Sequence, residues 1–512
     1  MLKLYSPLRV LKVFLFLLSL FLIIKKKKSF LFIKPLKPVN LKNTILDLGA
    51  SFIKLAQVLA TRADFFDESY LEQLKQLHDD IPSMSFENFQ AVYERNFTSQ
   101  TFSTFEQNPI ASASIGQVHK AVLHDGTIVA VKLRRVGIES RVKADIKIIN
   151  FFNSLFQPFF SFYTKNSIDA VISEFSKMIL EEVNLTTELN NLKQFSQAYI
   201  NSGIHFPKPY EEYCTNEVIV MSFESGFRFD DKENIFKHKI DFKAIIAKLV
   251  EFYTTQMLIN GYFHADPHPG NILITQKGEI VFLDFGMVKT VPEDKRIAII
   301  ELIKAANEKD YETYISASKK LGTIGYEAPV SELAQFTSKM FDIFSNDNLD
   351  SESMQKLAFE VLQTTRDFPF KLPSDAIYIL RVSAIVEGLG TTYIENFNGV
   401  KDILPILQQN IPRALGAQDS IAKTFKGYLS DLPFMVKNFK TVLHKGSEGT
   451  LEVEISKTQL EWLSKELKSY GSKVLNGFAF MIAGFFIIAV DSSLKGLAII
   501  LFSIGFFKVI YK

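Results

Sequence analysis

The chain has 512 residues, which at ~150 residues per domain allows about three domains. Hydrophobic residues make up 47% and charged residues 22%, which excludes disorder of the whole chain, and 58 Lys+Arg against 56 Asp+Glu leave a formal charge of +2 rather than the basic excess of a general nucleic-acid-binding protein. A single cysteine, Cys214, excludes an internal disulfide and a cysteine-based zinc cluster and indicates a reducing compartment.

Residues 1–34 form an apolar segment that ends in a basic cluster. Val13–Ile24 is a run of twelve residues without a charge, followed by four lysines, Lys25–Lys28. As a helix it spans only ~18 Å, short of the ~30 Å hydrocarbon core of a bilayer, and no small-x-small cleavage site of a signal peptide follows. We expect an interfacial or short anchoring helix with the lysines on anionic headgroups. The alternative is a helix packed inside the protein.

Residues 35–105 are expected to form an N-terminal helical extension. The residues that recur at three- and four-residue spacing, and so mark one face of one helix, are Leu46, Gly49, Ile53, Ala56 and Ala60. Lys54 and Gln57 lie one turn apart at the rim of this face, where a polar pair is ordinarily solvated.

Residues 106–225 change to strand character. Runs 117–123 and 127–133 flank His124-Asp125-Gly126, and Asp-Gly between such runs predicts a hairpin. A loop of small residues comes before it, and Lys132 lies on the second strand. Backbone N–H groups of such a loop can contact phosphate oxygens, and the lysine adds positive charge, so the combination favours nucleotide binding over an ordinary tight turn. The loop residues are Ala111, Ser112, Ala113, Ser114, Ile115, Gly116, Gln117 and Val118.

Residues 170–196 return to helical spacing and carry the acidic stretch 181–188. Asn184 and Glu188 are four residues apart, so we expect them on one helix face. A glutamate there could pair with Lys132 and hold it toward the phosphates, although acidic helix residues are more often solvated. Residues 215–223 read as a further strand.

The strongest motif lies between residues 264 and 286. His264-Ala265-Asp266-Pro267-His268-Pro269-Gly270-Asn271 comes before Asp284-Phe285-Gly286, within a region predicted as a helix over 240–260 and two short strands over 271–285. Phosphoryl transfer needs a carboxylate near the acceptor and oxygen ligands for Mg²⁺. Asp266 fits the first role, and Asn271 and Asp284 fit the second. His264 and His268 leave a zinc site as the alternative, disfavoured because no cysteine lies nearby.

The C-terminal region is predicted to be mainly helical from about 290 to 465 and to end in a membrane hairpin. Residues 474–490 and 496–507 carry no charge, and the polar turn 491–495 separates them. Lysines before and after the pair place the bulk of the chain in the cytoplasm by the positive-inside rule. A buried hairpin of a soluble domain is the alternative. The glycines expected to permit close helix contact are Gly477, Gly484, Gly496 and Gly505.

These motifs, in this order, resemble the UbiB family of atypical kinase-like proteins, also called aarF-domain kinases, of the bacterial type. The resemblance covers roughly residues 45–400, and the C-terminal hairpin also matches the bacterial members. The family's N-terminal signature reads here as Ser51-Phe52-Ile53-Lys54-Leu55-Ala56-Gln57 and, further on, Arg62-Ala63-Asp64. Its alanine-rich loop, in place of a glycine-rich loop, corresponds to Ala111–Gln117. Arg381 and Glu387-Gly388-Leu389-Gly390 also fit its pattern.

The resemblance implies roles for individual residues. It makes Lys132 the strand lysine, Glu188 its helix partner and Asp266 the catalytic-loop aspartate, with Asn271 and Asp284 as metal ligands. In the family the N-terminal extension lies over the active site and blocks access by a protein substrate. The residues of this chain that would take that regulatory role are Lys54, Gln57, Glu182 and Asn184.

Two positions depart from the family pattern. Its Lys-x-Gly-Gln is Lys-Leu-Ala-Gln here, with Ala56 at the glycine position. Its Glu-x-Asp is Glu182-Val183-Asn184, which removes one negative charge and leaves open how Lys54 is held and how many metal ions bind. The proposed Mg²⁺ ligands are retained.

We therefore expect an α+β, protein-kinase-like two-lobed fold with an N-terminal helical extension and a C-terminal transmembrane hairpin. The segments are 1–34, 35–105, N-lobe 106–225, C-lobe 226–345, a helical region 346–468 and the hairpin 469–512. The resemblance implies ATP and Mg²⁺ as cofactors and an ATPase-type activity that supports isoprenoid-quinone biosynthesis or membrane-lipid handling.

Two alternatives remain: a phosphotransferase acting on a small-molecule or protein hydroxyl, and a non-catalytic pseudokinase scaffold. The expected partners are a membrane lipid or quinone precursor and quinone-biosynthesis enzymes, with no nucleic acid and an open oligomeric state. The expected location is the bacterial inner membrane, with the soluble part in the cytoplasm.

Overall fold

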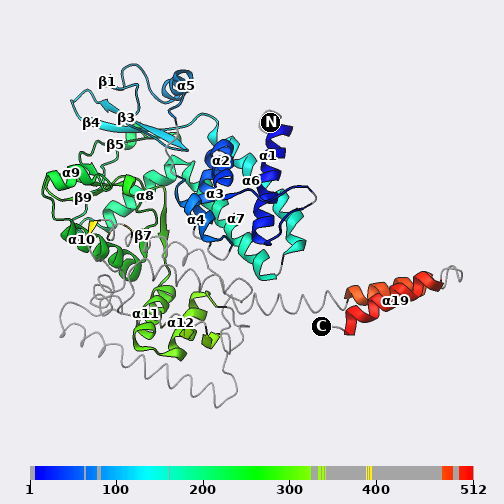
Figure 1. Ribbon diagram of the computed structural model, residues 1–512. Coiled ribbons are helices and arrows are strands. Elements are labelled where there is room, and N and C mark those ends of the chain that lie inside the picture. Colours follow the sequence, from blue (N-terminus) through cyan, green and yellow to red (C-terminus); the bar gives the residue numbers. More distant parts are fainter. Residues whose placement is uncertain are drawn as a thin grey trace, which may run out of the picture. The chain divides into compact units, whose positions relative to one another are not determined.

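An antiparallel five-stranded sheet forms the first lobe of the protein (Figure 1). The strand order is β1-β3-β4-β5, with β2 paired to β3. The predicted hairpin is confirmed: Val122 lies opposite Ile128, and Gly126 takes φ +85° in the turn between them. The strands are β1 (Thr104–Phe105), β2 (Ala111–Ser112), β3 (Gly116–Val122), β4 (Ile128–Arg134) and β5 (Val218–Ser222).

The two faces of this sheet have different neighbours. Val129, Val131 and Leu133 alternate along β4 and pack with Phe89 of α5 (Phe86–Asn96), which covers the outer face. Because successive strand residues point to opposite faces, Lys132 points to the inner face. Because side chains alternate between the two faces of the sheet along β4, the Lys132 side chain faces the second lobe.

The computed structural model describes residues 6–30, 32–60, 62, 65–77, 82–160, 162–324, 475–487 and 495–510, with a few positions between 333 and 394. The chain divides into two compact units, Met1–Ile421 and Ala422–Lys512. Arg381, Glu387 and Leu389 lie outside the described residues, as does nearly all of the predicted helical region 346–468.

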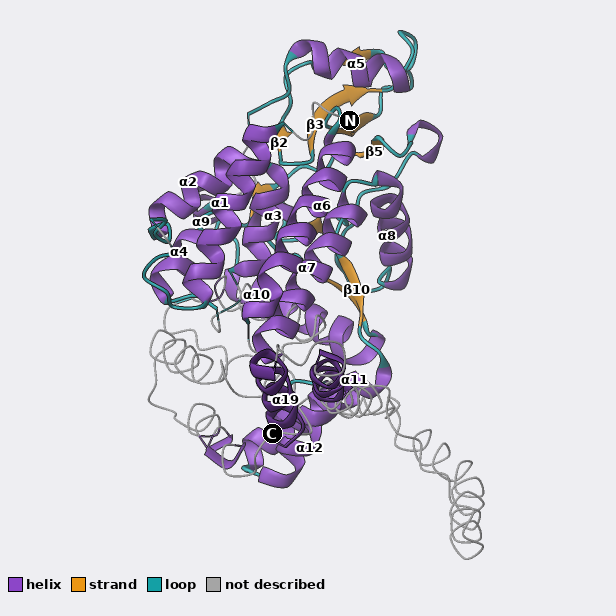
Figure 2. Ribbon diagram, turned by 90° about the vertical axis from the view of Figure 1, so that its right-hand side faces the viewer, coloured by secondary structure: helices purple, strands orange, loops and turns teal. Residues whose placement is uncertain are grey.

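The second lobe is built from helices and two small antiparallel sheets (Figure 2). One sheet has the order β6-β8-β9, and the other pairs β7 with β10. The predicted helix over 240–260 is confirmed, with its last turn widened into a π-helix. The elements are β6 (Phe227–Arg228), α9 (Lys232–Lys237), α10 (Phe242–Thr254), π-helix η3 (Thr255–Asn260), β7 (Tyr262–His264), η4 (Pro269–Asn271), β8 (Ile272–Ile274), β9 (Ile280–Phe282), β10 (Val288–Thr290), α11 (Glu293–Glu308) and α12 (Tyr311–Leu321).

The remaining helices of the first unit share its main hydrophobic core. Helix α7 packs against both α3 and α6, and α8 lies beside β5. These elements are α2 (Pro38–Leu48), α3 (Ala50–Leu59), α4 (Glu68–Lys75), α6 (Ile138–Phe156), η1 (Gln157–Phe159), α7 (Phe162–Glu182), α8 (Leu185–Ala198) and η2 (Glu211–Tyr213).

The prediction of one helix face running through Gly49 is wrong. Gly49 adopts φ +89° and ψ −160°, so α2 ends there and α3 begins at the next residue. Leu46 is consequently 46% exposed, whereas Ile53 and Ala56 are buried. Periodicity alone missed the break because glycine adopts positive φ without steric cost.

The N-terminal run packs against the protein, as the alternative stated. Helix α1 (Pro7–Ile24) begins before the apolar run and lies along α6. Val13 and Phe16 are almost fully buried in the main core. Among the described helices, α1 is the one long and apolar enough to cross a membrane, by length and composition only.

A buried ion pair fastens α1 to α6. The Arg9 guanidinium donates to both carboxylate oxygens of Asp145 at 2.8 Å, and the Asp145 side chain is only 1% exposed. Arg9 also donates to the Leu48 carbonyl at the end of α2. One arginine therefore joins α1 to the next helix, α2, and to α6, which is far away in sequence.

The second unit contains two apolar helices in contact, Leu475–Ile487 and α19 (Lys495–Ile510). A Cβ atom placed at Gly484 would lie 2.9 Å from the Ala498 carbonyl oxygen, and one at Gly505 would lie 2.5 Å from the Gly477 carbonyl oxygen. Close approach is therefore confirmed at Gly484 and at Gly505, which faces Gly477. The expectation for Gly496 is wrong, because a Cβ atom there would meet nothing within 4 Å. Phe478, Phe485 and other large apolar side chains on it are more than half exposed.

Candidate active site

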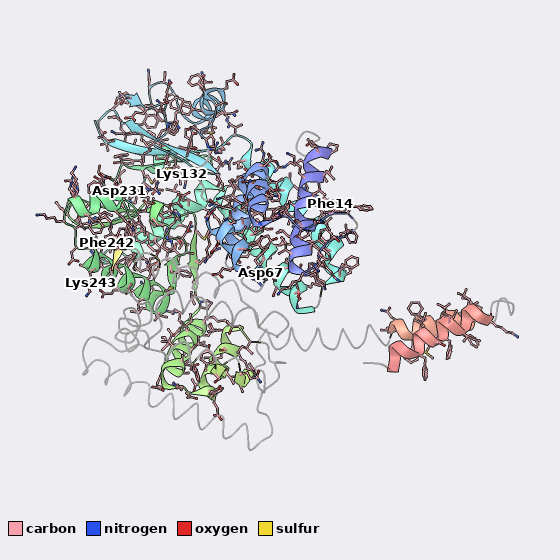
Figure 3. The ribbon with its side chains drawn as sticks, viewed as in Figure 1. Phe14, Asp67, Lys132, Asp231, Phe242 and Lys243 are labelled. Carbon is pink, nitrogen blue, oxygen red and sulfur yellow. The ribbon has the colours of Figure 1, made fainter. Side chains whose placement is uncertain are left out.

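Three charged side chains from three separate elements meet between the lobes. The Lys132 ammonium donates to Glu188 Oε1 and Oε2 at 2.6 and 2.8 Å, and to Asp284 Oδ2 at 2.8 Å. Figure 3 places Lys132 at the junction of the sheet and the lower lobe. The predicted pairing of Lys132 with Glu188 is therefore what the structure shows.

The charges of this cluster shift one another's pKa values. Burial alone would lower the pKa of Lys132, but the Asp284 and Glu188 carboxylates outweigh burial and raise it. Burial and the Asp284 charge raise the pKa of Glu188 to about 7, against the opposing effect of Lys132. Burial would raise the pKa of Asp284, but Lys132 and the Gly286 N–H hold it well below its usual range. A lysine that stays charged is suited to bind phosphate.

Short strand pairs bring the two motif loops together. Strand β7 leads into the loop that holds Asp266, β10 follows Asp284-Phe285-Gly286, and His264 lies opposite Val288 in their ladder. Strands β8 and β9 connect the loops a second time, because Leu283 N–H donates to the Asn271 carbonyl at 2.9 Å. The predicted metal ligands are thus held at neighbouring strand ends, Asn271 directly before β8 and Asp284 two residues after β9.

His264 serves to hold these loops. Its Nε2 bonds the Asp284 carbonyl, and its Nδ1 accepts from the Asp266 N–H at 3.4 Å. Both ring nitrogens are therefore engaged with backbone. Among the described residues, no group of three or more His, Cys, Asp and Glu side chains could hold a metal. The zinc alternative finds no support there.

Asp266 lies half-buried in the loop between β7 and η4. The Asn271 amide donates to its carbonyl at 3.3 Å, which closes the loop on itself. Tyr253 of α10 lies close enough that, after burial, the Asp266 charge contributes to raising the pKa of Tyr253 well above its usual value. The position leaves the Asp266 side chain partly accessible, as an acceptor-activating carboxylate requires.

The small-residue loop is a β-hairpin between β2 and β3. Ala111 lies opposite Val118 and Ser112 opposite Gln117, and the Ala113 N–H donates to the Gly116 carbonyl at 2.8 Å. A Cβ atom at Gly116 would lie 2.7 Å from the Leu133 carbonyl oxygen, so this glycine permits close approach of β3 to β4.

The side chains of this hairpin divide by role. Ile115 is buried in the main core, and Ser114 is 2% exposed with an unpaired hydroxyl. Gln117 is buried and bonds the His119 ring at 2.7 Å and the Met84 N–H at 2.8 Å. Its side chain therefore holds the N-terminal extension through Met84 and is not available to a ligand.

Sequence reasoning did not find Arg135, which holds the hairpin from below. Its guanidinium donates to the Ala113 carbonyl, the Ser112 hydroxyl and the Pro82 carbonyl at 2.7–2.8 Å. No pattern marked it, because the three acceptors come from two segments that only folding brings together. The adjacent Arg134 faces the other way, to the Val183 carbonyl and Glu217.

The N-terminal extension reaches the same site through Lys54. This side chain is only 5% exposed and forms a 2.9 Å ion pair with Glu182 Oε1. The expectation of a solvated rim is thus wrong, since α3 is buried on nearly all sides. Glu182 therefore holds Lys54 despite the missing carboxylate at position 184. The Gln57 side-chain oxygen is buried without a hydrogen-bond partner.

Glu182 also lies beside the Asp-Phe-Gly turn, which contains the predicted metal ligand Asp284. A Cβ atom added to Gly286 would lie 3.8 Å from Glu182 Cγ and 3.9 Å from Glu188 Oε2. The Glu182 charge contributes to raising the pKa of Glu188. The chain of contacts from Lys54 through Glu182 therefore ends at the Asp-Phe-Gly turn.

Asn184 does not share a helix face with Glu188. It is the N-cap of α8, where its side-chain oxygen accepts from the Thr186 N–H at 3.2 Å. Helix α7 ends at Glu182, so the predicted single helix is two helices. Asparagine is a favoured cap because its short side chain reaches the free N–H groups of a helix start.

Replacing Asn184 therefore tests a structural role. Asn184→Ala is expected to lower the opening free energy of the first turn of α8 by about 1 kcal/mol, because a free N–H group loses its acceptor. Asn184→Asp should keep it, since aspartate caps equally well. Amide hydrogen exchange at Thr186 and Glu188 measures the difference. Equal exchange in Asn184→Ala and wild type would exclude the capping role.

The donor set fits Mg²⁺ with a nucleotide. Mg²⁺ in such sites is held by one or two carboxylates together with substrate phosphates. Asp284 would supply a carboxylate, Asn271 an amide oxygen from the residue before β8, and Lys132 the positive charge for phosphate. Asp284 and Asn271 would hold the Mg²⁺, whose charge would offset that of the phosphates. Lys132 would orient the phosphates, and Asp266 would accept a proton from the attacking hydroxyl or water.

A lysine from the sheet, its glutamate partner on a helix and a His-x-Asp loop tied to Asp-Phe-Gly define a kinase-like class of protein. A family profile described as the ABC1 atypical kinase-like domain matches residues 76–318. An uncharacterized protein of the hydrogenase 1 5′ region of Clostridium pasteurianum is 30% identical, over 69% of this chain and 67% of its own length. The chain belongs to the ABC1 atypical kinase-like family.

Other relatives share less of their length. The chloroplastic protein ACTIVITY OF BC1 COMPLEX KINASE 7 of Arabidopsis thaliana is 28% identical over 72% of this chain and 54% of its own. The chain spans about half to two thirds of the length of the curated relatives it matches. A solved complex of Rv3197 with erythromycin from Mycobacterium tuberculosis matches with a TM-score of 0.45 and 22% identity, over 69% of this chain and 94% of that one.

Proposed function

We propose that this protein is a membrane-anchored, Mg²⁺-dependent ATPase of the kinase-like class that supports isoprenoid-quinone biosynthesis or the handling of a membrane lipid. The observation that carries the proposal is the Lys132–Glu188–Asp284 cluster, with Asn271 bound through its carbonyl to the Leu283 N–H next to Asp284. A decayed nucleotide site would not need to keep a buried lysine between two carboxylates.

Hydrolysis is favoured over protein phosphorylation by the position of the extension. The buried Lys54–Glu182 pair holds α3 against α7, whose last residue, Glu182, lies beside the Asp-Phe-Gly turn. In a protein kinase this side of the cleft must admit a substrate segment. A helix held there by a buried ion pair restricts the acceptor to water or a small group.

Membrane anchoring is supported by the exposed apolar side chains of the C-terminal hairpin. Its close glycine contacts let two helices pair without a polar interface. Lys465, Lys468 and Lys473 come before the hairpin and Lys508 and Lys512 end it, so both ends favour the cytoplasmic side of a bacterial inner membrane.

The test follows the γ-phosphate of labelled ATP with the full chain in liposomes. Wild type with Mg²⁺ should release free phosphate, and Asp266→Asn should lower the rate by about 10²–10⁴-fold, the usual contribution of a general base. Asp310→Asn is the matched control, because Asp310 caps α12 and asparagine caps equally well.

The fate of the label separates the three candidate functions. Label on a lipid or other hydroxyl would make the protein a phosphotransferase. If wild type consumed no ATP and Asp266→Asn bound nucleotide as wild type does, the pseudokinase scaffold would be the remaining candidate function. Quinone and precursor profiling in a deletion strain, complemented by wild type and by Asp266→Asn, tests the pathway.

A further inference from the structure

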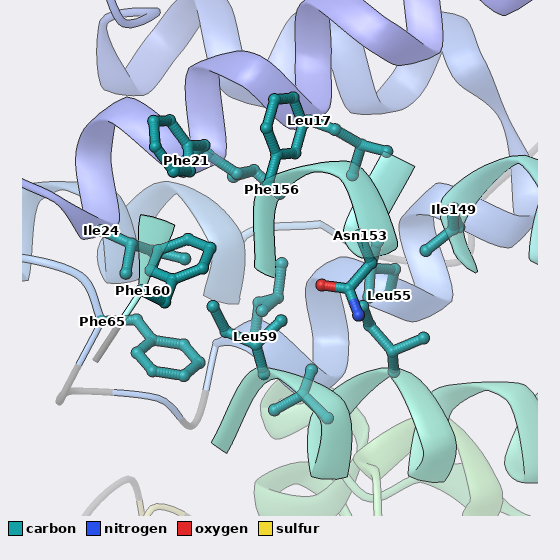
Figure 4. Close-up of a pocket in the computed structure, with 14 residues that line it drawn as sticks. Leu17, Phe21, Ile24, Leu55, Leu59, Phe65, Ile149, Asn153, Phe156 and Phe160 are labelled. Atoms are coloured by element: carbon teal, nitrogen blue, oxygen red, sulfur yellow. The ribbon is translucent and has the colours of Figure 1, made fainter. Parts of the chain in front are cut away.

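A largely apolar pocket lies between α1, α3, α6 and α7, away from the nucleotide site (Figure 4). Its empty volume is about 540 Å³, counted with its opening to solvent. Fourteen side chains line it, and Asn153 alone among them is polar. The Asn153 amide already donates to Asp169 Oδ1 at 2.8 Å.

The walls are shaped for a flexible hydrocarbon. Phe21, Phe156 and Phe160 pack ring to ring at centroid distances of 5.0–5.1 Å and form one side. Leu55 and Leu59 of α3 contribute aliphatic surface. Protein interiors contain few voids larger than a water molecule, and an empty apolar cavity forfeits contacts along its walls. An apolar occupant restores those contacts.

The charge beside the pocket indicates an anion. Ile24 lines the pocket, and Lys25–Lys28 follow it directly. The chain folds back there over the end of α1, because the Lys27 N–H donates to the Leu22 carbonyl. Within the described part of the chain these four lysines form no ion pair. Ten Lys and Arg and no acidic residue come before Asp47.

We propose that this pocket binds one hydrocarbon chain of an anionic membrane lipid, whose charged headgroup lies at Lys25–Lys28. The inference rests on the proposed membrane association and not on nucleotide turnover. Exposed apolar side chains beside the pocket, Leu155 and Phe159 at 53% and 63% exposure, offer a path for the chain from a lipid surface. Basic clusters next to apolar surface favour anionic lipids.

The test uses a sixteen-carbon fatty acid with a photoreactive group at its terminal carbon, in phosphatidylcholine liposomes with the full chain. Mass spectrometry should locate the label on α1, α3, α6 and α7. The affinity of a saturated fatty acid that competes with the probe should fall about fourfold for each buried methylene removed from it. Leu17→Trp, at a half-buried lining position, should reduce labelling at least tenfold. Leu15→Trp, on the exposed face of α1, should leave it unchanged.

A second set of variants tests whether the lysines bind a negatively charged headgroup. These variants change no residue of the hydrophobic core. Replacing Lys26, Lys27 and Lys28 with Gln should weaken labelling by the acid at least tenfold and leave the matching alcohol probe unchanged. The control replaces three exposed lysines of the second lobe in the same way: Lys237, Lys243 and Lys277.

The outcomes are decisive in both directions. Two results would overturn the proposed lipid pocket: labelling of Leu17→Trp at the wild-type level, and labelling found only on the C-terminal hairpin. Equal affinity of wild type for acid and alcohol overturns the headgroup site. Asp284→Asn should bind the probe as wild type does, so loss of ATP turnover and loss of lipid binding are separate results.

Discussion

Asp284→Asn is expected to lower MgATP turnover by about 10²–10³-fold, the usual loss when one preorganised electrostatic contact of a transition state is removed. The neutral amide weakens the hold on Mg²⁺ and also removes one of the two ion pairs of Lys132. Release of labelled phosphate at saturating ATP, with Mg²⁺ varied, measures both effects. The Mg²⁺ concentration for half-maximal rate should rise.

The control for this variant is Asp241→Asn. Asp241 caps α10 through its side chain, and asparagine accepts the same hydrogen bond from the Ala244 N–H. It should keep wild-type turnover. If Asp284→Asn hydrolysed ATP at the wild-type rate with the same Mg²⁺ dependence, Asp284 would not be the metal ligand and the enzymatic proposal would lose its main support.

Arg9→Ala is expected to lower the opening free energy of the α1–α6 contact by about 3–5 kcal/mol, because it leaves the Asp145 carboxylate buried without its partner. An uncompensated charge in the interior costs more than the lost attraction alone. Amide hydrogen exchange along α1 and α6 measures the local opening free energy.

A neighbouring ion pair on the same helix supplies the control. Lys12 contacts Asp47 at 2.8 Å, but both side chains are about half exposed or more. Lys12→Ala should therefore change the same exchange by less than about 1 kcal/mol. The double variant Arg9→Ala/Asp145→Leu removes the buried charge as well and should recover most of the loss. Failure of that recovery would attribute the effect to lost packing of the arginine stem.

Local sequence patterns were reliable where the structure is itself local. The Asp-Gly hairpin around Gly126, the strands on either side of it and the helix over 240–260 follow from residues that are neighbours in the chain. The boundaries at Gly49 and Asn184 were missed, because helical spacing continues through a glycine or a cap residue even where the backbone turns.

The N-terminal segment shows the limit of hydrophobicity as a guide. A run of apolar residues is equally compatible with a lipid surface and with a protein core. The ion pair between Arg9 and the buried Asp145 of α6 holds the N-terminal helix against the protein. These two residues are 136 positions apart in sequence. The same holds for Lys54, whose charge is paired by Glu182, a residue 128 positions further along the chain.

The sequence by itself determined which residues can carry the chemistry: the lysine on an apolar strand, and the two motif loops with their carboxylates and amide. Tertiary structure alone decided which partner each charged side chain meets, as in the Lys54–Glu182 pair and the Arg135 contacts with the hairpin. It alone also formed the apolar pocket beside α1. The physical reason is that helix caps and hairpin turns form between chain neighbours, whereas burial brings together distant segments that no local pattern records.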